Sequence, residues 1–193
     1  MGLIKRRAGA MLKLIILDRD GVINEDSDSY VKSCDEWRAI DGSIEAIVKL
    51  QQCGYKVAIA TNQSGIARKY LTLAELNLIH NKMIAAIKNA GGEFNVQNIF
   101  ICPHGPGDNC ACRKPKPGLL IQAANYFNVD PSEILFVGDA ERDILAAKAF
   151  GVKAALVTTG KGQKTLKQGG MDNIPVYKNL YALVNALAEG LWN

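Results

Sequence analysis

Two aspartates that directly follow a short apolar run are the residues of this sequence best suited to chemistry. Asp18 and Asp20 come after residues 14–17, and Gly21 permits a sharp turn behind them. Side chains two positions apart in an extended segment point the same way, so both carboxylates can face one site. Close carboxylates repel unless a cation lies between them, and Mg²⁺ suits oxygen ligands beside a phosphate substrate. An aspartate can also act as a nucleophile and form an aspartyl-phosphate. The alternative is that Asp-x-Asp-Gly is an ordinary turn after a strand.

A second acidic cluster follows another apolar run, at residues 134–137. Asp139 can complete a cation site with Asp18, because ligands of open α/β sheets bind at the carboxyl ends of the strands. Asp143, four residues later, falls one turn along the following helix. It either supports this cation site or is simply a favourable acid in the first turn of that helix.

Residues able to bind an anion follow the strand expected at residues 55–60. Small hydroxyl and amide side chains at the carboxyl end of a strand can hold phosphate oxygens, and they occur here as Thr61, Asn62, Gln63 and Ser64. The polar loop 25–33 either lines the same pocket or is a plain surface loop.

Two cations follow a cysteine-rich loop and stand beside prolines that stiffen the chain. Arg113 and Lys114, aimed at a fixed point, would stabilise a phosphoryl group during transfer. The alternative for residues 113–118 is a basic surface turn.

The cysteine-rich loop itself, residues 102–112, has the ligand types of a zinc site. It contains two glycines and two prolines, which indicate a loop, and four soft or borderline ligands suited to tetrahedral Zn²⁺: Cys102, His104, Cys110 and Cys112. Four protein ligands leave no open position, so the zinc is expected to be structural. The alternative is a coincidence of buried cysteines and a surface histidine. The other histidine, His80, is expected to be a surface or half-buried structural residue.

The elements that must position these residues alternate along the chain. Apolar runs predict strands at residues 14–17, 55–60, 96–102, 134–137 and 154–157, and helical periodicity predicts helices near 42–54, 72–91, 119–127, 144–150 and 179–191. Uninterrupted apolar strands are typical of a parallel sheet buried on both faces. Residues 158–162 are expected to form a flexible loop. The pattern therefore predicts an α/β fold with a Rossmann-like parallel sheet flanked by helices.

Length and composition favour one soluble globular domain. The chain has 193 residues, 48% of them hydrophobic, with a net charge of +4. We expect a loose tail at residues 1–10 and a single domain at 11–193. No apolar stretch reaches the ~20 residues of a membrane span, and no secretory signal is present. A zinc-stabilised module that binds nucleic acid is an alternative, but its basic and aromatic residues should cluster on one face, whereas here they are dispersed.

Taken together, the motifs resemble those of the haloacid dehalogenase-like phosphohydrolases. The shared motifs, in order, are Asp18-x-Asp20-Gly21, Thr61, Lys114 and Gly138-Asp139-x-x-x-Asp143. The resemblance implies that Asp18 is the nucleophile and that Asp20 protonates the leaving alcohol and then activates water. It also implies that Asp18, the Asp20 main-chain carbonyl and Asp139 hold Mg²⁺. Thr61 and Lys114 would hold the phosphoryl group, and Asp143 would support the metal ligands or Lys114. Asp20 needs a raised pKa for this role, which burial could supply.

A closer resemblance is to the D-glycero-D-manno-heptose 1,7-bisphosphate 7-phosphatase family, through Thr61–Arg68, the zinc loop and Arg113–Gly118. It implies a small zinc loop in place of a large cap domain. It also implies a phosphosugar substrate, with Arg113 binding the sugar's other phosphate or its hydroxyls and with Asn62, Gln63 and Ser64 contributing. The protein is expected to be a cytoplasmic monomer. The product would feed ADP- or GDP-heptose synthesis for lipopolysaccharide and related sugars.

Two features of the sequence depart from that family. The short spacing between His104 and Cys110 is shared with the histidinol-phosphate phosphatases, which are the alternative family. Ala140, next to Asp139, is small where heptose phosphatases can carry a longer polar side chain.

Overall fold

A computed structural model describes residues 11–192. Its centre is a six-stranded sheet in which all five pairs of neighbouring strands are parallel, in the order β3-β2-β1-β4-β5-β6. The strands are β1 (Leu14–Leu17), β2 (Lys56–Asn62), β3 (Ile99–Cys102), β4 (Ile134–Gly138), β5 (Lys153–Val157) and β6 (Val176–Tyr177).

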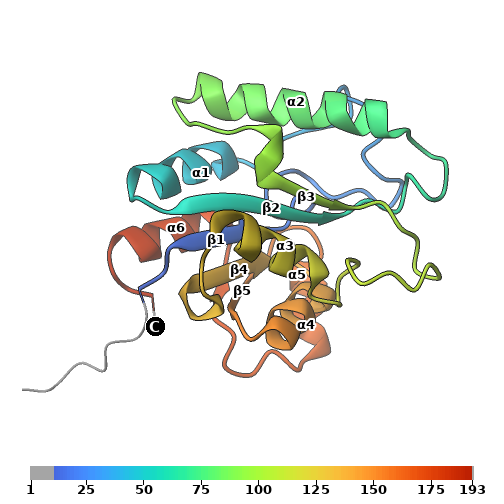
Figure 1. The fold of residues 1–193 in the computed structure, drawn as a ribbon. Coiled ribbons are helices and arrows are strands. Elements are labelled where there is room, and N and C mark those ends of the chain that lie inside the picture. Colours follow the sequence, from blue (N-terminus) through green and yellow to red (C-terminus); the bar gives the residue numbers. More distant parts are fainter. Residues whose placement is uncertain (1–10, 193) are drawn as a thin grey trace, which may run out of the picture.

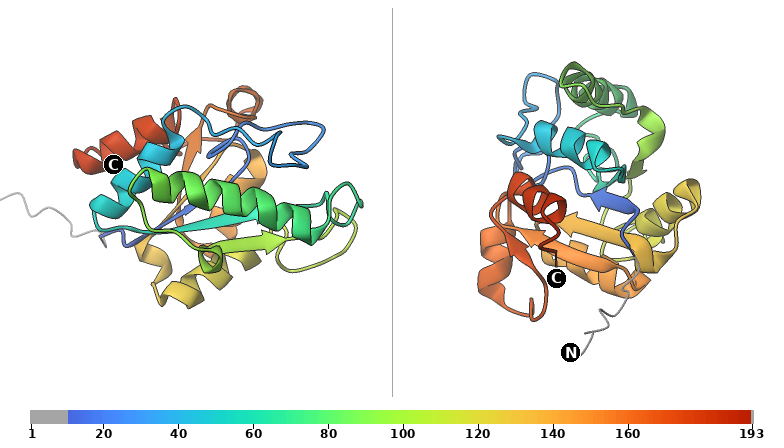
Figure 2. Two further views of the ribbon diagram at one scale, coloured as in Figure 1. Left: turned by 90° about the horizontal axis from the view of Figure 1, so that it is seen from above. Right: turned by 90° about the vertical axis from the view of Figure 1, so that its left-hand side faces the viewer.

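Helices cover both faces of this sheet (Figure 1). They are α1 (Ser43–Gln52), α2 (Leu73–Asn89), α3 (Gly118–Phe127), α4 (Glu141–Phe150), α5 (Gly162–Gln168) and α6 (Leu180–Ala188). Apolar side chains of α1, α2 and α6 form one core cluster, and those of α3 and α4 form the other. The left view of Figure 2 looks down on the face that carries α1, α2 and α6.

Strand β1 lies in the middle of the sheet because all of its side chains are apolar and fully buried. Ile15 and Leu17 pack into one core cluster, whereas Leu14 and Ile16 pack into the other. The strand order reverses beside β1, which pairs with both β2 and β4. In open α/β sheets this is the place where ligands bind, just beyond the carboxyl ends of the strands.

The predicted architecture is confirmed, with additions near the C-terminus. All five predicted strands are present, although residues 96–98 form a 3₁₀ turn before β3. The sequence analysis missed α5, which occupies Gly162–Gln168 after the expected loop, and it missed the two-residue strand β6. Both are short, so they lack the periodicity that identifies an element from sequence. The expected tail at residues 1–10 lies outside the described residues.

The segments outside the helices and strands matter most for the site. Within residues 11–192 no separate cap domain covers the carboxyl edge of the sheet; the loop after β3 extends past that edge instead (Figure 1). A search of the described helices finds none that is long and apolar enough to cross a membrane.

Candidate active site

A buried lysine and two aspartates form the floor of the site. Lys114 Nζ lies 2.8 Å from Asp18 Oδ1 and 2.8 Å from Asp143 Oδ1, and it donates a hydrogen bond to the Ala60 carbonyl at 2.9 Å. Asp18 follows β1, Asp143 is in the first turn of α4, and Ala60 is in β2. Residues from four separate segments are therefore held together by one ammonium group.

Three carboxylates converge beside this lysine. One oxygen from each of Asp18, Asp139 and Asp143 lies within 4.8 Å of the others, and all three residues are buried. Burial raises the pKa of Asp18 to about 6, against the opposing effect of Lys114. Burial and the nearby Asp18 and Asp143 charges raise the pKa of Asp139 to about 8. Asp143 behaves differently, because the cations Lys114 and Arg142 outweigh the effect of burial and lower its pKa.

This cluster fits a divalent cation that prefers oxygen ligands. Asp139 Oδ2 accepts a hydrogen bond from the Lys161 amide at 2.7 Å, but Asp139 Oδ1 is buried and has no hydrogen-bond partner among the described residues. A buried carboxylate oxygen without a donor is costly unless a cation contacts it. Mg²⁺ is held by one or two carboxylates in sites that act on phosphates.

Gly21 allows the chain to pass directly over this cluster. Its φ is +84°, a left-handed conformation that favours glycine, and a Cβ at this position would overlap Asp139 Oδ2. The Gly21 carbonyl accepts a hydrogen bond from Thr159 Oγ1 at 2.6 Å, which fixes the turn against the loop after β5. The predicted sharp turn is therefore present, and it also leaves the space that Asp139 occupies.

The structure does not give Asp20 the raised pKa that was expected. Although burial opposes it, Arg19 lowers the pKa of Asp20, with help from hydrogen bonds from Asn24 and Gln63. Arg19 folds back so that Nη2 donates to Asp20 Oδ1 at 2.8 Å and to Oδ2 at 3.0 Å. Asn24 Nδ2 and Gln63 Nε2 each donate to Asp20 at 2.9 Å. Asp20 is thus held as a carboxylate in the free protein, in the form that accepts a proton.

Arg19 is itself supported by His80. Arg19 Nη1 lies 3.2 Å from His80 Nε2, and both residues are buried. His80 must be neutral to accept this hydrogen bond, and burial together with the Arg19 charge lowers the pKa of His80 to about 3. The expectation that His80 is a surface or half-buried residue is therefore wrong, because it lies on the core-facing side of α2.

The segment after β2 connects the two halves of the site. Gln63 Nε2 donates to Thr61 Oγ1 at 2.8 Å as well as to Asp20. Asn62 and Lys114 exchange two hydrogen bonds of 3.1 Å, from Asn62 Nδ2 to the Lys114 carbonyl and from the Lys114 amide to Asn62 Oδ1. Asn62 therefore positions the backbone that carries the buried lysine.

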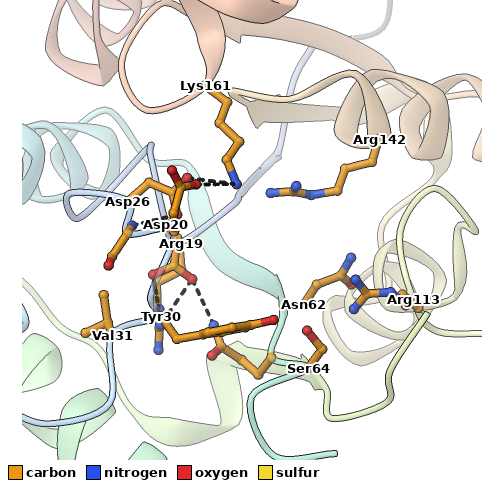
Figure 3. A pocket seen from close by; sticks show the side chains of 13 residues that line it. Arg19, Asp20, Asp26, Tyr30, Val31, Asn62, Ser64, Arg113, Arg142 and Lys161 are labelled. Carbon is orange, nitrogen blue, oxygen red and sulfur yellow. Dashed lines mark hydrogen bonds and ion pairs between the residues drawn. The ribbon is translucent and has the colours of Figure 1, made fainter. Parts of the chain in front are cut away.

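A pocket adjoins the buried Asp18–Lys114 pair (Figure 3). Its lining includes five site residues expected from the sequence, which are Asp20, Asn62, Gln63, Ser64 and Arg113, but not Asp18, Thr61 or Lys114. Asp26, Ser27, Asp28, Tyr30 and Val31 also line it. The polar loop 25–33 is therefore part of the pocket wall and is not a plain surface loop.

The loop after β3 gathers the four predicted zinc ligands. Cys102 Sγ is 3.7 Å from Cys110 Sγ and 3.6 Å from His104 Nδ1, and His104 Nδ1 is 3.3 Å from Cys112 Sγ. All four ligand atoms lie within 4.8 Å of one another, and the cysteines are free thiols. With metal–ligand bonds of ~2.0–2.3 Å, a tetrahedral zinc site requires separations of this size. Arg113 Nη1 donates to the His104 carbonyl at 3.2 Å, so the loop also orients Arg113.

Comparison with known proteins identifies the family. The family model for haloacid dehalogenase-like hydrolases matches residues 7–151. A heptose 1,7-bisphosphate 7-phosphatase of Neisseria meningitidis is 55% identical over 159 residues, which cover 82% of this chain and 84% of that protein. The corresponding enzyme of Bordetella bronchiseptica is 50% identical over 179 residues, which cover 92% and 99%. The chain belongs to the haloacid dehalogenase-like hydrolases, in the heptose bisphosphate phosphatase family.

The folds of this hydrolase and of solved relatives also agree. The crystal structure of D,D-heptose 1,7-bisphosphate phosphatase from B. bronchiseptica, complexed with magnesium and phosphate, superposes with a TM-score of 0.88 at 49% identity. The match covers 93% of this chain and 99% of that one. The enzyme from Burkholderia thailandensis gives a TM-score of 0.72 at 38% identity, covering 91% and 98%.

The site of the hydrolase contains residues that the sequence analysis did not single out. Arg19, Arg142 and Lys161 line the pocket, and His80 lies behind Arg19. Arg19 and Arg142 directly neighbour the motif residues Asp18 and Asp143 in the sequence, and this position could have marked them as candidate site residues. The contribution of His80 could not be predicted from the sequence, because α2 contacts the turn at Asp20 only in the folded structure.

Proposed function

We propose that this chain is a Mg²⁺-dependent phosphomonoesterase that removes the 7-phosphate of D-glycero-β-D-manno-heptose 1,7-bisphosphate. The observation that carries the proposal is the buried Asp18–Lys114 pair. It lies next to Arg19 and Arg142, which line a pocket together with side-chain amides. The names of the relatives supply the sugar and its β configuration.

Asp18 is the proposed nucleophile. Its Oδ1 is held by Lys114 and by the Arg19 amide, which donates at 2.7 Å, so the carboxylate cannot rotate freely. A carboxylate oxygen of Asp18 attacks phosphorus, and the bond between phosphorus and the C7 oxygen breaks. Lys114 lies beside this carboxylate, and Thr61 is linked through Gln63 to Asp20. Both are proposed to stabilise the charge of the phosphoryl group as it is transferred.

Asp20 is the proposed acid and base. It gives a proton to the departing C7 oxygen, and it then accepts a proton from the water that attacks the aspartyl-phosphate, which restores Asp18 and releases phosphate. The Arg19 clamp favours the second role, because it holds Asp20 as a carboxylate. The anionic phosphate of the substrate raises the pKa of a nearby carboxyl and so favours the first role.

Asp18, Asp139 and the main-chain carbonyl of Asp20 are the proposed ligands of Mg²⁺, with Asp143 holding Lys114 in place. When bound, the metal ion neutralises charge on the phosphoryl group and aligns it for in-line attack. The partnerless Asp139 Oδ1 and the proximity of the three carboxylates support this assignment.

The Cys102–His104–Cys110–Cys112 cluster is proposed to hold a structural Zn²⁺. The separations of its ligand atoms support this assignment. Four protein ligands would fill the tetrahedral coordination of the zinc, which leaves no open position for a substrate. The zinc would brace the loop from which Arg113 reaches the pocket.

The test compares two substrates. Phosphate release in the presence of Mg²⁺ is measured with heptose 1,7-bisphosphate and with histidinol phosphate, and Asp18→Asn serves as the inactive control. A higher kcat/KM on the heptose, lost in Asp18→Asn, is expected. Preference for histidinol phosphate would assign the chain to the alternative substrate class, which its relatives do not favour. Turnover that survives in Asp18→Asn would contradict the mechanism.

A further inference from the structure

Arg142 points into the pocket from the first turn of α4 (Figure 3). Its Nε is buried and has no hydrogen-bond partner among the described residues. Its Nη2 lies 3.8 Å from Asp18 Oδ2, which is too long for a hydrogen bond. The side chain is about two-thirds buried, and a poorly satisfied guanidinium group in such a place is costly unless an anion contacts it in the working enzyme.

All the other charged groups of the pocket lining except Arg113 have a charged partner. Lys161 Nζ is 3.2 Å from Asp26 Oδ2, and Asp20 is engaged by Arg19. Arg113 donates to a carbonyl rather than to a carboxylate. Arg113 and Arg142 are therefore the two arginines of the pocket lining whose charge is not matched by a hydrogen-bonded carboxylate.

The carboxylates nearest to Arg142 do not need its charge either. Asp18, Asp139 and Asp143 carry three negative charges when ionised, and Lys114 together with one divalent cation balances them. A guanidinium group is not deprotonated in proteins, so Arg142 keeps its positive charge. In the metal-loaded enzyme its charge is free for the substrate.

The family resemblance already implies that Arg113 binds the second phosphate or the hydroxyls of the substrate, and we propose that Arg142 binds that second phosphate with it. This inference rests on the proposed function, in which the substrate carries a second phosphate. A planar guanidinium group contacts a phosphate through two parallel hydrogen bonds, so two arginines on one pocket suit a dianionic group. Ala140, beside Asp139, has no polar atom in its side chain, whereas Arg142, two residues further on, has a guanidinium group that can donate to a phosphate.

The test uses two substrates that differ only in the second phosphate, heptose 1,7-bisphosphate and heptose 7-phosphate. For Arg142→Ala we expect KM for the bisphosphate to rise about 10- to 100-fold, as for loss of a charged hydrogen-bonding group. We expect kcat to stay within about twofold, and the kinetics on the 7-phosphate to change little. Arg142→Lys should recover only part of the lost affinity, because lysine keeps the positive charge but cannot form the two parallel hydrogen bonds of a guanidinium group. Lys148→Ala removes an exposed cation from the same helix outside the pocket and is the matched control.

A second measurement does not depend on turnover. The Kd of the product, heptose 1-phosphate, is measured by calorimetry and should rise in Arg142→Ala by about the same factor as KM. An equal loss on both substrates would overturn the proposal, because Arg142 would then act on the transferred group. Unchanged KM and Kd would overturn it as well. If wild-type protein hydrolyses heptose 7-phosphate but not the bisphosphate, the proposed function fails, and the role of Arg142 fails with it.

Discussion

Lys114 Nζ lies 2.8 Å from Asp18 Oδ1, and both side chains are almost completely buried. Asp18 directly follows the central strand β1, whereas Lys114 comes from the segment that follows the cysteine-rich loop. The ion pair therefore joins the proposed nucleophile to the segment that follows the Cys102–His104–Cys110–Cys112 cluster. Its energy is tied to Asp143, which contacts the same ammonium group.

Replacing Lys114 with methionine should damage both catalysis and stability. Loss of a positioned cation typically costs about 10²–10³ in kcat. Leaving buried carboxylates without their cation should lower the free energy of unfolding by about 3–5 kcal/mol. Urea unfolding and initial-rate kinetics measure the two effects, with Lys88→Met, which removes an exposed lysine, as the control. Wild-type stability in Lys114→Met would show that the cluster does not depend on this charge.

Gly21→Ala should weaken metal binding more than it weakens the fold. The new methyl group would displace Asp139 Oδ2 and therefore the proposed Mg²⁺ ligand. Gly54→Ala is a matched control, because Gly54 has nearly the same φ, +85°, and nothing lies within 4 Å of the place that its new methyl group would take. The Mg²⁺ concentration for half-maximal activity should rise at least about tenfold in Gly21→Ala relative to Gly54→Ala. Equal values in the two variants would contradict the prediction, because the new methyl group at position 21 would then leave the proposed metal site undisturbed.

Breaking the cysteine cluster should remove zinc and disturb the pocket. Cys112→Ser should lose the zinc ion that we expect at one per chain, because a serine hydroxyl is a poor zinc ligand. Since Arg113 follows directly, kcat/KM should fall at least about tenfold through misplacement of its side chain. Elemental analysis and kinetics measure both, and Cys53→Ser, at an exposed free cysteine, is the control. Zinc-free wild-type protein with full activity would contradict a zinc requirement.

His80 should make the fold sensitive to mild acid. Its pKa is about 3 in the folded chain and 6.5 when exposed, so the unfolded state binds a proton that the native state does not. Stability is therefore lost as pH falls below about 6.5, and only below pH 3 would the native state take up that proton. Between pH 7 and pH 5 the wild type should lose about 2 kcal/mol more than His80→Gln, whose side-chain oxygen can still accept from Arg19. Urea unfolding at the two pH values tests this, and equal losses would exclude His80 as the source.

The sheet and the motif residues were predictable because each is encoded locally. Leu14–Leu17 is an uninterrupted apolar run, and Asp18 must then lie at the carboxyl end of a buried strand. The helix expected near residues 72–91 likewise begins where its sequence encodes a capping box, and the reciprocal hydrogen bonds of Thr72 and Glu75 are present.

What was missed depends on contacts between distant segments. The lowered pKa of Asp20 follows from Arg19 folding back, and that conformation depends on His80, 61 residues away along the chain. Burial alone had predicted a raised pKa, because the sequence does not say which cation will share the buried space. Arg142 was overlooked for a similar reason, since only the assembled pocket shows that its charge has no hydrogen-bonded partner.

The most direct test of the account is ³¹P NMR of heptose 1,7-bisphosphate during turnover, with wild-type protein and with Asp18→Asn. The account predicts that the C7 phosphate signal is replaced by inorganic phosphate while the C1 phosphate signal remains, and that Asp18→Asn leaves both esters intact. Loss of the C1 phosphate, or unchanged turnover by Asp18→Asn, would contradict it.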